Sequence, residues 1–305
     1  MTHLARGVRA VFILLCLLSS AAAQDKGTLT PKVLPPLANP SDPATPAKEL
    51  FGRARQAAPL DPDPIGFYSK GCLAGGQQLP INGPNWQVMR LSRNRNWGHP
   101  NLIAFLERFA PKAAAASGWP GILVGDMSQP RGGPMLTGHA SHQIGLDADI
   151  WLTPMPNREF SRAEREELSA TDMVREDLLD VNDHWTDGQM AAVRTAAEDP
   201  AVQRIFVNAA IKRAMCREAK GESWMSKVRP MYGHNYHFHI RLFCPKDSET
   251  CKDQDPTPGG DGCDASLAWW FSDEVLHPKK KSTKVWPPMT MSGLPAECRE
   301  VLKAQ

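Results

Sequence analysis

The chain has 305 residues, of which 35 are Lys or Arg and 33 are Asp or Glu, giving a formal net charge of +2. Its first 23 residues contribute two of the basic groups and no acidic one, so the remainder carries 33 charges of each sign. This neutral balance excludes nucleic acids and anionic membranes as partners, because both require a basic surface.

A secretory signal pattern opens the chain. Arg6 and Arg9 precede an apolar run at residues 11–18, and three alanines precede Gln24. We expect cleavage after Ala23 and export of the rest, because the apolar run is shorter than the ~20 residues that span a bilayer. No later stretch is long and apolar enough either, so we expect no transmembrane segment.

Composition divides the exported part into three segments. Residues 24–64 are rich in Pro and Ala and lack an amphipathic period, which predicts a disordered tether. Residues 65–276 carry regular hydrophobic patterns and are predicted to form one domain. Residues 277–305 form a tail rich in Pro and Lys, which a disulfide at Cys298 would tie back to the domain.

Six cysteines remain once Cys16 leaves with the signal: Cys72, Cys216, Cys244, Cys251, Cys263 and Cys298. An even number in an exported chain indicates up to three disulfides, whose pairing the count alone leaves open. The sequence contains no C-x-x-C motif, which disfavours a zinc-thiolate site.

Helices and strands follow one another in the domain without a regular alternation. Pro100 begins a predicted helix, and Pro111 is expected to end or kink it. Its apolar face comprises Leu102, Ile103, Leu106 and Phe109. Further strands are expected at residues 121–125 and 204–207, and helices at residues 190–198 and 209–219. This order predicts an α+β fold with a small central antiparallel sheet, flanked by helices and long disulfide-linked loops.

Two segments of the domain show the strict alternation of strands. Residues 146–152 place Asp149 on the face opposite their apolar side chains, and residues 236–243 do the same with His237 and His239. Two strands that present polar groups opposite their core residues have the geometry that a metal site on a sheet requires. We therefore expect these strands to form the two halves of one site.

The residue types in these segments favour zinc. His142, Asp149 and His239 supply the nitrogen and oxygen donors that zinc prefers, and three protein ligands leave a fourth position for a water that the metal activates. His237 shares the face of His239 and is predicted to act as general base or to stabilise the tetrahedral intermediate. His234 lies at the start of the strand, where it would share that role.

Longer strings of the sequence strengthen this interpretation. They are SKGC at 69–72, VMR at 88–90, GHP at 98–100, GHASHQIGLDAD at 138–149, RIFVN at 204–208 and KVRP at 227–230. From about residue 65 to Cys298 the chain resembles the penicillin-insensitive murein endopeptidases. These belong to a zinc metallopeptidase superfamily with the lysostaphin-type endopeptidases, the D-alanyl-D-alanine metallopeptidases and the hedgehog domain.

The resemblance implies a zinc-dependent D,D-endopeptidase of the periplasm. Such an enzyme hydrolyses the D-alanyl to meso-diaminopimelyl cross-link of peptidoglycan through a metal-activated water. Penicillin acylates a serine nucleophile, so an enzyme without one is insensitive to it.

The resemblance also assigns roles to individual residues. His142, Asp149 and His239 match the zinc ligands, so that Asp149 is preferred to Asp147 as the acidic ligand. His237 matches the active-site histidine, and His234 matches the accessory one.

Further positions of the family pattern suggest a second metal ion and a set of disulfides. His139 and Asp177 match metal-contacting positions, although the histidine expected shortly after Asp177 is absent and Asp180 stands near its place. The matching cysteines would pair as Cys72 with Cys298, Cys216 with Cys263, and Cys244 with Cys251.

Two other functions fit parts of the pattern. A D,D-carboxypeptidase or dipeptidase of the same superfamily would trim stem peptides and leave cross-links intact. In those relatives an acidic residue just before the His-x-His serves as the base, whereas here Asn235 and Tyr236 occupy that place. The third possibility is a non-catalytic zinc or peptidoglycan-binding module, against which the full set of histidines argues.

Overall fold

The structure is a computed structural model that describes residues 26–278 and 287–305. The predicted signal peptide, residues 1–23, lies outside the described residues, as does part of the Lys-rich tail. Within these two ranges, no helix has both the length and the apolar character needed to cross a membrane.

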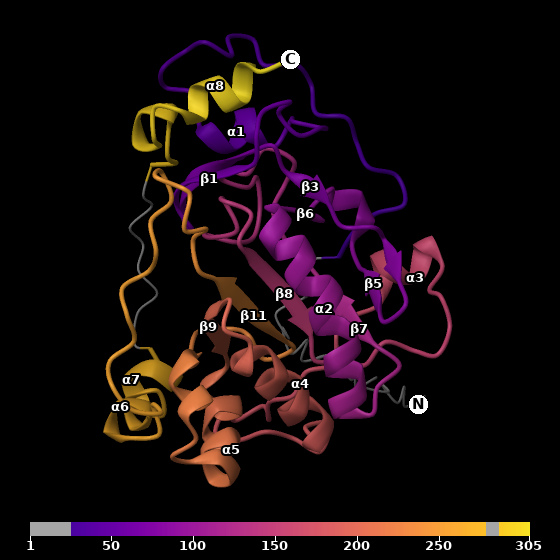
Figure 1. Cartoon of the computed structure of the whole chain (residues 1–305), viewed down its shortest axis with the longest axis vertical. Helices are drawn as coiled ribbons and strands as arrows, with labels where there is room; N and C mark the ends of the chain where they lie inside the picture. Colours follow the sequence, from indigo (N-terminus) through magenta and orange to yellow (C-terminus); the bar gives the residue numbers. More distant parts are fainter. Residues whose placement is uncertain (1–25, 279–286) are drawn as a thin grey trace, which may run out of the picture.

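A seven-stranded mixed sheet forms the centre of the fold, in the order β10-β9-β11-β8-β7-β5-β4 (Figure 1). Neighbouring strands are antiparallel except for the pairs β10–β9 and β5–β7, which are parallel. The strands of this sheet are β4 (Asn82–Gly83), β5 (Trp86–Val88), β7 (Ile122–Val124), β8 (Asp147–Trp151), β9 (Val202–Val207), β10 (Val228–Pro230) and β11 (His237–Leu242). Two small antiparallel pairs accompany it: β1 (Asp63–Phe67) with β2 (Lys70–Ala74), and β3 (Gln77–Gln78) with β6 (Trp97–Gly98).

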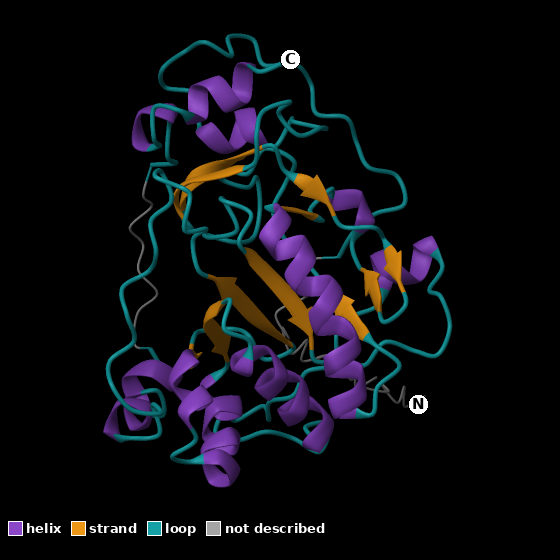
Figure 2. Ribbon diagram, viewed as in Figure 1, coloured by secondary structure: helices purple, strands orange, loops and turns teal. Residues whose placement is uncertain are grey.

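Helices surround the sheet in the described part of the chain (Figure 2). They are α1 (Ala47–Phe51), α2 (Pro100–Ser117), α3 (Arg162–Glu167), α4 (Asp187–Glu198), α5 (Ala209–Ala219), α6 (Ala265–Trp269), α7 (Asp273–Leu276) and α8 (Cys298–Lys303). Short 3-10 turns occupy Leu91–Arg93, Ser223–Lys227 and Met291–Gly293. The predicted α+β class is confirmed, although the sheet is larger than expected and not purely antiparallel.

The main core lies between one face of the sheet and the helices α2 and α4. Leu102, Leu106 and Phe109 of α2 are buried there with Ile150 of β8 and Phe238 of β11. Ala148 and Ile150 of β8, and the apolar residues of β11, thus face these helices. Their alternating partners, which include the acidic residues, the histidines and Trp151, are left on the opposite face of the sheet.

Helix α2 begins and continues for identifiable reasons. The His99 side chain caps it by accepting a hydrogen bond from the Asn101 backbone N–H, and Pro100 occupies the first helical position. Of the two effects expected of Pro111, an end or a kink, the end does not occur, because α2 runs on to Ser117. Pro111 and Glu107 are exposed, so water can satisfy the Glu107 carbonyl that loses its helical partner.

A second, smaller core joins the two ends of the described chain. Phe51 of α1 and Val301 of α8 are buried there together with Ile65 of β1, and these elements lie side by side in Figure 1. The disorder expected for residues 24–64 therefore does not extend through the whole segment, because α1 packs into this core. The disulfide between Cys72 and Cys298 links β2 to α8 and confirms that the C-terminal tail is tied back.

The other two disulfides also follow the pairing that the resemblance implies. Cys216 at the end of α5 is bonded to Cys263, just before α6, and Cys244 is bonded to Cys251 in a short local loop. The Cys216–Cys263 bridge ties the chain just before α6 to α5, and the Cys244–Cys251 bridge closes a loop directly after β11.

Candidate functional site

The pairing of β8 with β11 builds the centre of the site. In this antiparallel pair Asp149 lies opposite His239, Trp151 opposite His237, and Asp147 opposite Arg241. Side chains directly opposite one another in such a pair have Cβ atoms only about 5 Å apart. The predicted face alternation of both strands is confirmed, and it brings a carboxylate and two histidines together.

The loop that enters β8 places His142 at this centre by means of unusual backbone geometry. His142 has a positive φ of 66°, and its N–H donates to the Asp147 carboxylate at 3.0 Å, which compensates for the strain. Gly145 has φ 72°, and a Cβ there would lie 2.6 Å from the Leu73 side chain. The glycine three residues after His142 is thus required for the turn that carries the imidazole inward.

Four histidines converge on the Asp149 carboxylate. Its Oδ1 lies 3.2 Å from His239 Nδ1, 3.4 Å from His142 Nε2 and 3.6 Å from His237 Nε2. Its Oδ2 lies 3.5 Å from His139 Nε2. Burial opposes the charged form of Asp149, but the histidines, led by His237, outweigh it and hold its pKa well below the usual range.

This cluster has the donor set of a metal site. The ligand atoms of His139, His142 and Asp149 all lie within 4.8 Å of one another. His142 Nε2 and Asp149 Oδ1 are buried and make no hydrogen bond to any described residue. Buried polar atoms without partners are costly, and a cation among them would satisfy both at once. The residues present therefore fit a bound metal ion.

Asp147 contacts different partners from those of Asp149. Both of its oxygens accept from the Arg241 guanidinium, at 2.8 and 3.2 Å, and Oδ1 also lies 3.1 Å from His239 Nε2. A carboxylate beside Nε2 favours a proton on that nitrogen and leaves Nδ1 free to face the cluster. Burial opposes protonation of His239, but Asp147 raises its pKa overall. Asp149 is therefore the carboxylate that faces the histidine cluster, whereas Asp147 is engaged by Arg241 and orients His239.

His139 lies between two carboxylates at the edge of the cluster. Its Nε2 is 3.0 Å from Asp126 Oδ2 and 3.5 Å from Asp149 Oδ2. Asp126 therefore competes with any cation for this nitrogen.

The structure does not bring Asp177 into this group. Its carboxylate is exposed, pairs with Arg175 and accepts from the Leu179 N–H. Among the described residues, the metal-type cluster contains no residue of that loop.

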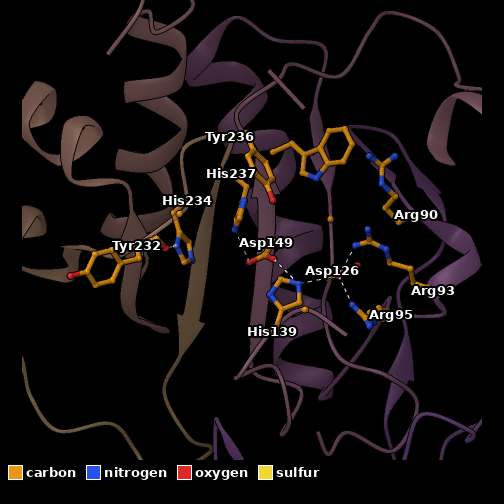
Figure 3. Close-up of a pocket in the computed structure, with 14 residues that line it drawn as sticks. Arg90, Arg93, Arg95, Asp126, His139, Asp149, Tyr232, His234, Tyr236 and His237 are labelled. Carbon is orange, nitrogen blue, oxygen red and sulfur yellow. Dashed lines mark hydrogen bonds and ion pairs between the residues drawn. The ribbon is translucent and has the colours of Figure 1, made fainter. Parts of the chain in front are cut away.

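His237 and His234 border a cavity of about 290 Å³ above the cluster (Figure 3). Burial lowers the pKa of His237 to about 4 and that of His234 to about 3, so both imidazoles are neutral at pH 7. His234 Nδ1 lies 2.8 Å from the Tyr232 carbonyl. Because a carbonyl can only accept, Nδ1 carries the proton, and Nε2 is left as an acceptor.

The opposite wall of the cavity is formed by residues whose role the pattern did not indicate. Arg90, Arg93 and Arg95 lie across Asp149 from His234 and His237 (Figure 3). Asp126 Oδ2 accepts from Arg93 and from Arg95, each at 2.9 Å. The three arginines follow β5 and Asp126 follows β7, so only the fold brings these groups together.

The described fold is thus an α+β domain whose sheet carries a buried cluster of histidines and carboxylates at the base of a polar cavity. Residues 64–303 match the model of the penicillin-insensitive murein endopeptidase family. The chain is 44% identical over 244 residues to a penicillin-insensitive murein endopeptidase of Haemophilus influenzae, covering 79% of this chain and 82% of that protein. Proteins of the same name from Pectobacterium atrosepticum and Salmonella paratyphi B are each 41% identical, covering 79% and 78% of this chain and 84% and 85% of theirs. The chain belongs to this family.

Asp126 is expected to contribute strongly to stability at neutral pH. Burial would raise its pKa, but the hydrogen bond from His139 and the charges of Arg95 and Arg93 hold it far below the usual range. Asp126→Asn leaves two guanidinium groups without their buried partner, so we expect the free energy of unfolding at pH 7 to fall by about 3 kcal/mol.

The loss of unfolding free energy in Asp126→Asn should depend on pH. A carboxyl whose pKa is depressed by folding stabilises the protein above its unfolded pKa and loses that contribution as the pH falls toward its folded pKa. The difference between wild type and Asp126→Asn should therefore shrink below about pH 4. Urea unfolding at pH 7 and pH 3.5 measures it, with Asp177→Asn at the exposed carboxylate as the control. An equal effect of both variants at pH 7 would contradict the role given to Asp126.

Proposed function

We propose that this protein is a zinc-dependent D,D-endopeptidase that hydrolyses the D-alanyl to meso-diaminopimelyl cross-links of peptidoglycan. The observation that carries the proposal is the triangle of donors His142 Nε2, Asp149 Oδ1 and His239 Nδ1. Its relatives are named murein endopeptidases, which supports the substrate class.

The two sides of the triangle that meet at Asp149 have lengths that match zinc. Two ligand atoms that each lie ~2.1 Å from a tetrahedral zinc ion are separated by roughly 3.4 Å. The pairs His142 Nε2–Asp149 Oδ1 and His239 Nδ1–Asp149 Oδ1 are 3.4 and 3.2 Å apart. When bound, zinc supplies a Lewis acid that polarises the scissile carbonyl and lowers the pKa of water.

The histidines beside the triangle would handle the proton and the developing charge. His237 lies on the cavity side of Asp149, and its Nδ1 makes no hydrogen bond to a described residue. It is placed to accept a proton from the attacking water and to return it to the leaving amine. His234, with Nε2 as its free acceptor, lies 4.8 Å from His237 between ring centroids and can share this transfer.

The cavity offers no nucleophile that penicillin could acylate. Among the described residues that line it, there is no Ser, Thr or Cys. Hydrolysis there must use water directly, without a covalent acyl intermediate on such a side chain. This supports insensitivity to penicillin.

The guanidinium groups on the wall of the cavity are complementary in charge to a carboxylate of the proposed substrate. The lining holds the three guanidinium groups of Arg90, Arg93 and Arg95 against the two carboxylates of Asp126 and Asp149. In the cross-link, the amine released on cleavage sits on a carbon that also carries a carboxylate. Arg93 is positioned to bind that carboxylate by a charge-assisted hydrogen bond.

Export to the periplasm is part of the proposal. The sequence opens with a secretory signal pattern, and the described chain has three disulfides, which form in oxidising compartments. Peptidoglycan lies in the same compartment.

The function is tested by incubating the purified mature protein with cross-linked muropeptide dimers. We expect conversion of dimers to monomers, complete inhibition by a zinc chelator, recovery on adding zinc, and no inhibition by penicillin. Release of free D-alanine without loss of dimers would instead identify a carboxypeptidase. If the amounts of dimer and of free D-alanine both stay unchanged, the protein is a non-catalytic binding module.

Metal binding and turnover are expected to separate in single variants. Asp149→Ala and His239→Ala should lose zinc, because each removes one of three ligands. His237→Ala should keep zinc and lose roughly 10²- to 10⁴-fold in kcat, the usual contribution of a general base. Elemental analysis gives the zinc content, dimer cleavage gives kcat, and His184→Ala at an exposed histidine is the control. A metal-free Asp149→Ala protein with full activity would refute the ligand assignment.

Arg93→Gln should weaken recognition of the cross-link. Loss of a hydrogen bond to a charged group is worth ~1.5–3 kcal/mol, so kcat/KM should fall roughly ten- to hundredfold. The same substitution should have little effect on a dimer whose carboxylate beside the scissile bond has been converted to an amide. Arg217→Gln, which affects only an exposed ion pair with Asp180, is the matched control. If both dimers slow equally, Arg93 acts by supporting the fold and not by binding the carboxylate.

A further inference from the structure

An exposed row of aromatic side chains leads out of the active-site cavity. Tyr232 lines the cavity yet is 58% exposed, and its ring packs against Trp270 with centroids 4.7 Å apart. Trp269 continues the row at 5.3 Å from Trp270 and is 47% exposed. In Figure 3 the Tyr232 ring points away from Asp149 and the arginines. We call Tyr232, Trp270 and Trp269 the aromatic ledge.

Trp269 is not packed under a loop, because it keeps nearly half of its surface in contact with solvent. Exposed apolar patches on soluble proteins generally mark binding sites. This one adjoins the cavity where the cross-link would be cut.

The ledge is held in place by several contacts. The Trp269 indole N–H donates to Glu274, and the Arg213 guanidinium lies 4.5 Å from the centroid of the neighbouring Phe271 ring. The disulfide from Cys216 to Cys263 ties the start of α6 to α5. A surface with fixed aromatic rings binds a ligand without a large cost of ordering side chains.

The same residues connect the ledge to the catalytic histidines. The Tyr232 carbonyl accepts from His234 Nδ1. The intervening Gly233 has φ 69°, and its carbonyl oxygen accepts a hydrogen bond from the Asn208 side-chain amide at 3.0 Å. A ligand that settles on Tyr232 therefore lies within two residues of His234.

The chemistry of the rings indicates what the ledge binds. A pyranose ring has an apolar face of C–H groups that packs flat against an aromatic ring, while its hydroxyls remain in water. Peptidoglycan carries its sugars about four residues from the cross-link, a separation of roughly 14 Å when extended. The sugars of a bound substrate must then lie outside the cavity, on the surface next to it.

We propose that the aromatic ledge binds the glycan strand of the substrate, so that the protein recognises sugars as well as the cross-linked peptide. The inference rests on the proposed function for the identity of the polymer. The existence of the ledge depends only on the exposure and ring contacts of Tyr232 and Trp269.

The proposal is tested with two substrates and two variants of the zinc-loaded protein. One substrate is a cross-linked dimer that keeps its glycan chains, and the other is the same dimer after an amidase has removed the sugars. We expect Trp269→Ala and Tyr232→Ala to lower the ratio of kcat/KM for the sugar-bearing over the sugar-free dimer about tenfold. Phe243→Ala removes an aromatic side chain of similar exposure that does not line the cavity, and should leave the ratio unchanged.

A binding measurement separates this inference from the proposed function. Peptide-free glycan oligosaccharides are titrated into the protein while tryptophan fluorescence is recorded, and Trp269→Ala should abolish the response. Glycan binding without cleavage would uphold the ledge and refute the endopeptidase, whereas cleavage without glycan binding would do the reverse. An unchanged substrate ratio, or a dimer of the protein that Trp269→Ala dissociates, would overturn the ledge as a glycan site.

Discussion

The register of β8 against β11 is the constraint on which the site depends. It sets Asp149 opposite His239 and Asp147 opposite Arg241, while Phe238 and Ile150 meet on the other face in the core. A slip of one residue would turn the polar side chains of one strand into that core. The burial of apolar residues against α2 and α4 therefore also fixes the positions of the donors. Packing energy on one face of the sheet is what preorganises chemistry on the other.

Two of the three buried carboxylates at the site are balanced by guanidinium groups. Asp147 is neutralised by Arg241, and Asp126 by Arg93 and Arg95, whereas Asp149 faces only histidines. Unpaired buried carboxylates are strongly destabilising, so Asp149, whose carboxylate is surrounded by four imidazoles, is the position in this cluster that most requires a cation. The charge distribution thus distinguishes Asp149, the proposed ligand, from Asp126 and Asp147. Spacing in the sequence could not do this alone.

The strands and their faces could be predicted because apolar and polar residues alternate with a period of two in residues 146–152 and 236–243. The cavity wall could not, since Asp126 meets Arg93 and Arg95 only through the tertiary arrangement of separate loops. Helix α1 was missed for a related reason. Its Pro-rich surroundings indicate disorder, but burial of Phe51 against the C-terminal helix outweighs that local preference. Sequence patterns report local periodicity, and long-range partners override them.

One short stretch of chain, from Tyr232 to His239, joins the proposed glycan-binding ledge to the proposed catalytic histidines. It begins on the exposed ledge, passes through His234 with its positive φ of 56°, and ends in the β11 histidines opposite β8. The N–H of Asn208, directly after β9, donates to the His234 carbonyl at 3.0 Å. Because β11 also pairs with β9, both His234 and the β11 histidines are held against this strand. A strained residue persists only where its surroundings fix it. The positive φ of His234 is therefore maintained by the contacts that hold the chain on either side of it, and the Tyr232 carbonyl on one side binds its Nδ1.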